Sequence, residues 1–175
     1  MARSRKAYDR VIELLGTSSA DFRTLDHPRE RSTNIVSSML GCDRAAFVES
    51  AVVMVKTSKN EKVYVLAAIP SDRQVDFGAI RAMRGGSYAG PAHPDIARRL
   101  SGCASGTEVP FSWDADLVVV VDPLVYDHDE IYFPAGRPDR AVALVAEDHR
   151  RIVQAAEHSI SKESSGPANP AARPS

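Results

Sequence analysis

The sequence predicts an α/β fold in which helices flank a mixed β-sheet. Apolar runs of strand length interleave with helix-like segments without a strict βαβ order, which favours a mixed sheet. A chain of 175 residues, 43% of them hydrophobic, can bury roughly two-thirds of its unfolded surface and needs no disulfide or metal to stabilise its core. We therefore expect one domain over residues 1–158. Residues 159–175 are mainly Ser, Pro, Ala and Gly, which predicts a disordered tail.

The first third of the chain predicts two helices and a strand. Apolar residues at helical spacing indicate the first helix, which the Gly-Thr-Ser-Ser run at 16–19 ends. Pro28 lies just beyond the strand and breaks it, because proline restricts the residue before it. Ser32 or Thr33 caps the second helix, and Gly41 ends it. The predicted elements are a helix over residues 7–15, a strand over residues 22–25 and a helix over residues 33–40.

The rest of the chain is rich in predicted strands. Two apolar runs on either side of the polar segment 56–62 predict a hairpin that is buried on both faces. Pro70 begins a turn, and Asp122-Pro123 ends the strongest strand signal. The predicted strands cover residues 51–55, 63–69, 117–121, 130–133 and 141–145. The predicted helices cover residues 77–83, 94–100 and 147–157, the last with acidic residues at its start.

Composition excludes several classes of protein. The 22 basic and 23 acidic residues give a net charge of −1, which excludes a uniformly basic nucleic-acid binder and an acidic disordered chain. Two cysteines are too few for a disulfide scaffold. No apolar run approaches the roughly 18–20 residues of a membrane helix, and the basic N-terminus lacks the apolar stretch of a secretory signal. We expect a cytoplasmic protein with no membrane partner.

Common catalytic motifs are absent from the sequence. It contains no phosphate-binding Gly-x-x-x-x-Gly-Lys loop, no Gly-x-Gly-x-x-Gly, no Gly-x-Ser-x-Gly and no His-Glu-x-x-His. The five histidines lack the spacing of metal ligands, so we expect neither a metal nor a cofactor. Cys42 and Cys103 are interpreted as packed residues. His27, in a tight turn, is either a turn residue bonded to backbone or a catalytic base.

Two glycine-containing segments are candidate ligand loops. Residues 102–111 (Gly-Cys-Ala-Ser-Gly-Thr-Glu-Val-Pro-Phe) combine two glycines with a proline, and residues 133–136 (Phe-Pro-Ala-Gly) lie between two predicted strands. Glycine lets another molecule approach the backbone, so such loops can present N–H groups to a ligand oxygen. Both segments are also compatible with ordinary structural turns.

These loops belong to a longer series of segments that points to a family. The series comprises residues 22–28 (Phe-Arg-Thr-Leu-Asp-His-Pro), the end of the hairpin at 65–76, the loop at 102–111, Val-Asp-Pro-Leu at 121–124 and Glu-Ile-Tyr-Phe-Pro-Ala-Gly at 130–136. In this order the segments resemble the YbaK-like family of aminoacyl-tRNA editing domains, over about residues 21–152. That family includes free-standing trans-editing proteins and the editing insertion of bacterial prolyl-tRNA synthetases. The resemblance implies a barrel-like mixed-sheet fold with a pocket between sheet and helices.

The resemblance also implies an activity, namely hydrolysis of the ester that links a wrong amino acid to the tRNA 3′ end. The Gly-x-x-x-Pro loop at 106–110 would hold the aminoacyl carbonyl with backbone N–H groups, aimed where negative charge develops. A ribose hydroxyl of the substrate and a positioned water would replace a protein nucleophile. The implied partners are the tRNA 3′ end and, as a further candidate, an aminoacyl-tRNA synthetase. The implied catalytic residues are Gly106 and Ser50. The implied substrate-binding residues are His27, Arg44, Thr107, Glu108, Val109, Pro110, Asp122, Pro134, Ala135 and Gly136.

One departure from the family pattern concerns positive charge. The family carries a lysine just before the first hairpin strand, where it contacts the terminal phosphate or ribose; here the position falls on Glu49, Ser50 or Ala51. Lys56 lies roughly 20 Å farther along an extended strand than Ser50. Arg44 is the candidate replacement. Basic residues that could bind the rest of the tRNA are Arg3, Arg5, Lys6, Arg10, Arg137 and Arg140.

Three functions are consistent with these observations. The first is a trans-editing deacylase. The second is a catalytically silent relative that lacks the lysine and binds an aminoacyl ligand or a protein partner. The third is a hydrolase or acyl-transfer enzyme that acts on another aminoacyl ester or thioester.

Overall fold

The computed structural model describes residues 6–164. Its helices and strands follow in this order: α1 (Ala7–Thr17), β1 (Phe22–Asp26), α2 (Thr33–Leu40), η1 (Arg44–Ala46), β2 (Val48–Ser58), β3 (Glu61–Pro70), β4 (Arg73–Val75), α3 (Phe77–Met83), β5 (Tyr88–Pro91), α4 (Pro94–Ser101), β6 (Leu117–Val121), η2 (Pro123–Asp127), β7 (Glu130–Arg137), β8 (Arg140–Val145), α5 (Ala146–Val153), β9 (Ala156–Glu157) and β10 (Ser161–Glu163).

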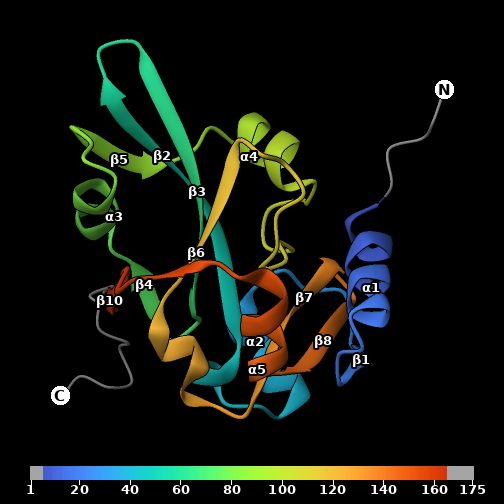
Figure 1. The fold of residues 1–175 in the computed structure, drawn as a ribbon. Coiled ribbons are helices and arrows are strands. Elements are labelled where there is room, and N and C mark those ends of the chain that lie inside the picture. The colour runs from blue at the N-terminus through green and yellow to red at the C-terminus, as the bar shows by residue number, and fades with distance from the viewer. Residues whose placement is uncertain (1–5, 165–175) are drawn as a thin grey trace, which may run out of the picture.

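The strands form three sheets. The largest has the order β5-β2-β3-β6-β9 and is mixed, because β2 pairs antiparallel with β3 and β5, whereas β6 pairs parallel with β3 and β9. An antiparallel sheet of order β1-β8-β7 packs beside it, and β4 pairs with β10. A parallel bridge between Phe47 and Tyr132 joins the start of β2 to β7. The predicted mixed-sheet α/β class is confirmed (Figure 1).

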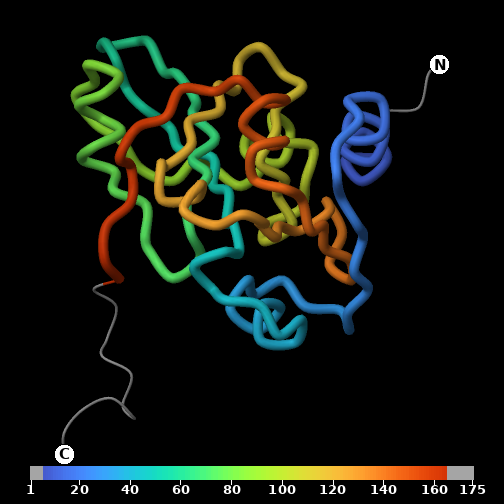
Figure 2. The backbone as a smooth tube through the Cα atoms, turned by 60° about the horizontal axis from the view of Figure 1, so that its bottom comes forward, coloured from blue at the N-terminus to red at the C-terminus, as the bar shows by residue number. Residues whose placement is uncertain are grey.

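The main core lies between the two larger sheets. Residues of β2, β3, β6, β7 and β8 contribute, together with the loop that follows α4. On the outer side, α1 lies along β7 and β8 (Figure 1) and places Val11 and Leu15, both fully buried, against this core. Figure 2 shows that the first and last described elements, α1 and β10, lie on opposite sides of the molecule.

Most predicted elements are confirmed, including the capping of α2. The Ser32 hydroxyl oxygen accepts from the Ile35 N–H, and Gly41 ends the helix with a left-handed φ of 69°. The hairpin is confirmed as β2 and β3, but its strands run through most of the polar segment 56–62. Two short strands, β4 and β5, were not predicted, because neither has a clear apolar run.

Three sequence-based predictions require correction. Residues 133–136 lie within strand β7 and are not a loop. The closing helix ends at Val153, because Gln154 adopts a left-handed φ of 46°, and Ala156–Glu157 pairs as β9 with β6. The predicted disordered tail begins too early. Ile160 is fully buried against β2, β3 and α3, and Ser161–Glu163 forms β10. Residues 165–175 of that predicted tail lie outside the described residues.

Asp122 explains why the C-terminal segment is ordered. Its buried carboxylate accepts hydrogen bonds from the Ile160 N–H (3.0 Å), the Ser161 N–H (2.9 Å) and the Ser161 hydroxyl (2.7 Å). The other carboxylate oxygen accepts from the Leu124 N–H. Hydrogen bonds to a charged acceptor are among the stronger ones in proteins, so this residue fastens the C-terminal segment to the end of β6. Among residues 6–164, no helix combines the length and apolarity that a membrane crossing requires.

Candidate functional site

A cavity of about 520 Å³ lies beside the first half of β2. Residues 49–51 of β2 pair with β3 on one side, but β5 reaches only residues 53–56 on the other. Residues of β2 line one part of the cavity. Residues of α4, of the loop after α4 and Pro134 of β7 line another part. The lining residues are Arg31, Thr33, Glu49, Ser50, Ala51, Val52, Ala92, Pro94, Asp95, Ala97, Arg98, Cys103, Ala104, Ser105, Gly106, Glu108 and Pro134.

The loop after α4 presents a backbone donor at this cavity. The Gly106 N–H donates to Glu108 Oε2 at 2.9 Å, and both residues line the cavity. Gly106 has a φ of +86°, a conformation that favours glycine. A Cβ added there would lie 2.8 Å from the Arg31 carbonyl oxygen and 2.9 Å from the Arg31 Cβ. Only glycine therefore lets the loop pack against the backbone of Arg31, at the edge of the cavity.

Buried hydrogen bonds of Thr107 and His149 hold this loop in place. The Thr107 N–H and hydroxyl both donate to the Ala104 carbonyl oxygen, at 3.0 and 2.7 Å. His149 of α5 approaches the Pro110 carbonyl oxygen with Nε2 at 2.9 Å, and its Nδ1 lies 2.7 Å from the Tyr126 hydroxyl. Since the carbonyl can only accept, Nε2 carries the proton and Nδ1 accepts from Tyr126. Burial lowers the pKa of His149 to about 4, so the ring is neutral at pH 7.

Three carboxyl groups line the cavity, those of Glu49, Asp95 and Glu108, and two of them, Glu49 and Glu108, have raised pKa values. Burial raises the pKa of Glu108 to about 7; the Gly106 N–H opposes this rise and the nearby Glu49 charge adds to it. Burial also raises the pKa of Glu49, against the effects of the Thr33 hydroxyl, which donates at 3.2 Å, and of the Arg44 charge. Glu108 is consequently present in both protonation states near neutral pH. Perturbed carboxyl groups in a cleft are typical of binding and catalytic sites.

Ser50 differs from its neighbours in having no hydrogen-bond partner. Its side chain is 4% exposed, and its Oγ is the buried side-chain N or O atom without a partner among the described residues. It lies on the cavity wall, whose lining also includes the small side chains of Ala51, Ala92, Ala97, Cys103 and Ala104. A buried hydroxyl without a partner is unusual in a folded protein and requires an explanation.

The structure places the predicted site residues in two groups. Ser50, Gly106, Glu108 and Pro134 line the cavity. The other predicted residues do not line it; they are His27, Arg44, Thr107, Val109, Pro110, Asp122, Ala135 and Gly136. Thr107, Val109 and Pro110 are buried supports of the loop.

The remaining predicted residues have structural contacts elsewhere. His27 Nδ1 lies 2.7 Å from the Pro28 carbonyl oxygen, which favours the turn interpretation over a catalytic base. Arg44 donates to the Ser71 carbonyl oxygen. Ala135 is fully buried, and Gly136 packs against α1, where an added Cβ would lie 2.9 Å from that of Ala7. Asp122 fastens the C-terminal segment and does not line the cavity, and its contact with substrate stays a prediction.

Several lining residues were missed from the sequence. Arg31, Glu49 and Arg98 bring charge to the cavity, and Thr33 orients Glu49. Arg98 lies on α4 beside Arg99, where an exposed pair of arginines resembles any solvated helix face. Arg31 lies in an irregular segment with no periodic signal. Only the contact between Arg31 and Gly106 shows that the two segments meet, and no local pattern encodes it.

The fold and cavity define a small mixed-sheet α/β domain whose cavity is lined by a loop with a backbone donor, the Gly106 N–H, and by carboxyl groups. The chain belongs to the family of aminoacyl-tRNA editing domains, whose family model matches residues 27–152. Members act on aminoacyl-tRNA, and the chain is accordingly an aminoacyl-tRNA deacylase, a hydrolase that acts on ester bonds.

Relatives in sequence and in structure agree with this assignment. The chain is 34% identical over 155 residues to the multifunctional Ser/Thr-tRNA deacylase ProXp-y of Escherichia coli strain K12, covering 88% of this chain and 92% of the relative; the protein of strain O157:H7 matches equally. The hypothetical protein APE2540 shares the fold with a TM-score of 0.78 at 18% identity, over 87% of this chain and 99% of that one. A structure described as a candidate trans-editing enzyme for prolyl-tRNA synthetase has a TM-score of 0.74 at 18% identity, over 91% and 99% of the two chains.

Proposed function

We propose that this protein hydrolyses the ester of seryl or threonyl groups attached to the wrong tRNA, acting in trans. The observation that carries the proposal is the Gly106 N–H, which already holds a carboxylate oxygen at 2.9 Å on the cavity side of the loop. That oxygen stands where the carbonyl oxygen of an ester would sit. The choice of seryl and threonyl groups rests on the 34% identical relative, which is a Ser/Thr-tRNA deacylase.

The proposed reaction is substrate-assisted. The ester carbonyl oxygen displaces Glu108 from the Gly106 N–H, and this donor stabilises the negative charge that develops on the oxygen. A water molecule, oriented by the free ribose hydroxyl of the terminal nucleotide, adds to the carbonyl carbon. The bond from that carbon to the ribose oxygen then breaks, the ribose oxygen takes up a proton, and free amino acid and uncharged tRNA leave. None of these steps requires a protein nucleophile.

Positive charge for the tRNA end is proposed to come from Arg31 and Arg98. Both are exposed side chains that line the cavity, and the structure records no ion pair for either of them within residues 6–164. Arg44, the replacement expected from the sequence, is instead directed to the Ser71 carbonyl oxygen and does not line the cavity. Charge-assisted bonds from arginine to phosphate are stronger than neutral ones, so two arginines can substitute for one lysine.

The decisive experiment is a deacylation panel with the purified full chain. Seryl-, threonyl-, alanyl-, valyl- and prolyl-tRNA are incubated with enzyme and with buffer, and the remaining aminoacyl-tRNA is measured with time. We expect seryl- and threonyl-tRNA to be hydrolysed many times faster than in buffer. Hydrolysis of the whole panel at the buffer rate would refute the proposal. Turnover of small aminoacyl thioesters without turnover of tRNA would favour the alternative substrate class instead.

A further inference from the structure

We propose that Ser50 recognises the side-chain hydroxyl of the bound aminoacyl group and thereby makes the cavity selective for seryl and threonyl esters over alanyl and valyl esters. The inference rests on the proposed function, because it specifies how the same cavity chooses its substrate. Ser50 also occupies one of the three positions at which the family resemblance places a lysine.

The first argument is that Ser50 is an exception among the buried hydroxyl groups of the described chain. The other buried serines and threonines all donate to, or bond with, a protein oxygen. Their acceptors are Glu49 for Thr33, Asn34 for Ser37, Arg44 for Ser71, Cys103 for Ser101, Ala104 for Thr107 and Asp122 for Ser161. Ser50 alone of this set has none. Among the buried hydroxyl groups within residues 6–164, the fold thus leaves only that of Ser50, on the cavity wall, without a partner.

The second argument is energetic. A buried polar group that lacks a partner destabilises the folded state, because it has given up its hydrogen bonds to water. Ser50 is 4% exposed and its Oγ has almost no contact with solvent, so bulk water does not offset this cost. A serine hydroxyl can rotate among staggered positions and can both donate and accept. A ligand that brings a polar group to the cavity wall can therefore supply the missing bond.

The third argument concerns which group of the ligand reaches Ser50. The substrate carries an ammonium group, a carbonyl oxygen and a side chain. Glu49 and Glu108 are acceptors suited to an ammonium, and the Gly106 N–H is suited to the carbonyl oxygen. The cavity lining also includes five small side chains, those of Ala51, Ala92, Ala97, Cys103 and Ala104, which leave room for a small aminoacyl side chain. The hydroxyl of a seryl or threonyl side chain is the polar group that remains.

Such a contact discriminates strongly between similar substrates. A purely apolar pocket rejects an analogue that adds a hydroxyl only weakly, whereas a site built to bond a hydroxyl rejects the analogue that lacks it. Serine and alanine differ by this one oxygen, and threonine and valine are nearly equal in shape. The two pairs therefore isolate the hydroxyl contact from the size of the side chain.

The experiment compares kcat/KM for seryl- and alanyl-tRNA, and for threonyl- and valyl-tRNA, in the natural protein and in Ser50→Ala. We expect Ser50→Ala to lower the ratio of kcat/KM for seryl- over alanyl-tRNA, and for threonyl- over valyl-tRNA, about tenfold, equivalent to about 1.4 kcal/mol. Ser50→Cys replaces the hydroxyl with a somewhat larger thiol that donates only weakly, so its loss of selectivity should be intermediate. Because Ser50→Ala removes only an unpartnered oxygen, its thermal stability should equal or exceed that of the natural protein.

The matched control is Ser71→Ala, which removes another buried hydroxyl that does not line the cavity. Ser71→Ala should change kcat/KM for all four substrates by the same factor. An unchanged seryl-to-alanyl ratio in Ser50→Ala, with the natural protein active, would overturn the inference and leave the proposed function intact. Absence of turnover by the natural protein on every substrate would instead refute the proposed function, and the two failures are therefore distinguishable.

Discussion

At the scale of single residues, Gly106 makes the clearest connection between backbone geometry and chemistry. Its positive φ directs its N–H to Glu108, and its missing Cβ lets the loop contact the backbone of Arg31. These two requirements can be separated, because Gly102 has a similar φ of +72° but nothing within 4 Å of an added Cβ. An alanine at Gly102 would introduce backbone strain alone, whereas an alanine at Gly106 would introduce the same strain and a collision with Arg31. The two substitutions therefore form a matched pair.

We predict that Gly106→Ala reduces deacylation at least tenfold and lowers the free energy of unfolding by about 1–3 kcal/mol, because the methyl group forces the loop away from Arg31. Gly102→Ala should lower the stability by about 1 kcal/mol and retain most activity. Urea denaturation and single-turnover deacylation measure the two effects. Equal activity losses in both variants would show that the collision with Arg31 has no functional consequence.

Glu108 predicts a pH dependence of stability. Its pKa in the folded protein, about 7, lies above the ordinary value of 4.5, so the folded state binds more protons than the unfolded state between these values. The contribution of Glu108 to the free energy of unfolding therefore falls as pH rises from about 4.5 to 7. Above that range it stays constant. Glu108 changes the free energy of unfolding by about 3 kcal/mol at most over this range, because part of its pKa shift comes from Glu49 and solvent weakens the effect.

The measurement compares urea unfolding of the natural protein and Glu108→Gln from pH 4.5 to 8. A comparison is needed because His149 acts in the opposite direction. Its pKa falls from 6.5 to about 4 on folding, so its contribution to stability rises with pH between about 4 and 6.5. We expect the natural protein to lose stability relative to Glu108→Gln as pH rises toward 7. A constant difference across the range would contradict the elevated pKa of Glu108.

At the scale of elements, the C-terminal segment is part of the fold and not an appendage. Ile160 fills a cluster formed with β2, β3, β6 and α3, and β10 pairs with β4. The carboxylate of Asp122 links this segment to the end of β6. One buried isoleucine and one buried carboxylate thus convert a serine-rich stretch into an ordered strand.

We predict that Ile160→Ala lowers the free energy of unfolding by about 2–5 kcal/mol, since it removes a fully buried side chain and leaves a cavity. The matched control is Ile35→Ala on α2, where the same side chain is 47% exposed and should contribute less than about 1 kcal/mol. Thermal unfolding by circular dichroism measures both. Similar stabilities of the two variants would show that the C-terminal segment contributes little to the fold.

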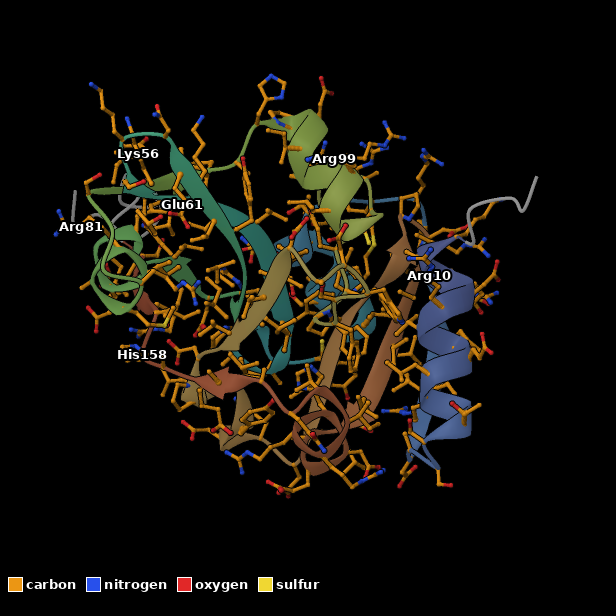
Figure 3. All side chains as sticks on the ribbon, turned by 45° about the horizontal axis from the view of Figure 1, so that its top comes forward. Arg10, Lys56, Glu61, Arg81, Arg99 and His158 are labelled. Carbon is orange, nitrogen blue, oxygen red and sulfur yellow. The ribbon has the colours of Figure 1, made fainter. Side chains whose placement is uncertain are left out.

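At the scale of the whole molecule, the near-neutral net charge is distributed and not segregated. The labelled cationic side chains Arg10, Lys56, Arg81 and Arg99 come from α1, β2, α3 and α4; Lys56 and Arg81 lie on one side of the molecule and Arg10 on the opposite side (Figure 3). Arg137 and Arg140, two of the basic residues proposed from the sequence, form ion pairs with Asp139 and Asp26. Arg3 and Arg5 lie outside the described residues. Arg31 and Arg98 are the cationic residues that line the cavity.

We predict that the double variant Arg31→Ala/Arg98→Ala binds uncharged tRNA more weakly and with a weaker dependence on salt. Loss of two phosphate contacts to a single-stranded end should make the slope of log K against log salt concentration shallower by about 1.4. Arg23→Ala is the control, because Arg23 is already paired with Glu130 at 2.8 Å, away from the cavity. A slope identical to that of the natural protein would exclude Arg31 and Arg98 as phosphate contacts.

Local sequence patterns predicted the elements well where one signal dominated. The apolar runs of β3 and β6 and the Ser32 and Gly41 signals of α2 each depend on neighbours in the chain. Predictions were wrong where tertiary contacts prevailed. The Phe-Pro-Ala-Gly segment looked like a turn, but pairing with β8 holds it in a strand. Burial of Ile160 likewise outweighs the composition of its surroundings.

The sequence by itself determined the mixed α/β class, the order of most elements, the family and the Gly106–Pro110 loop, because all of these are written in local periodicity or in contiguous motifs. Only the tertiary structure decided that Ser50 lacks a partner, that Glu108 occupies the Gly106 N–H, that Arg31 meets the loop and that Asp122 serves the fold. Most of these facts depend on which distant segments meet, at the cavity beside β2 and at the end of β6. Packing sets that arrangement, and no pattern among neighbouring residues records it.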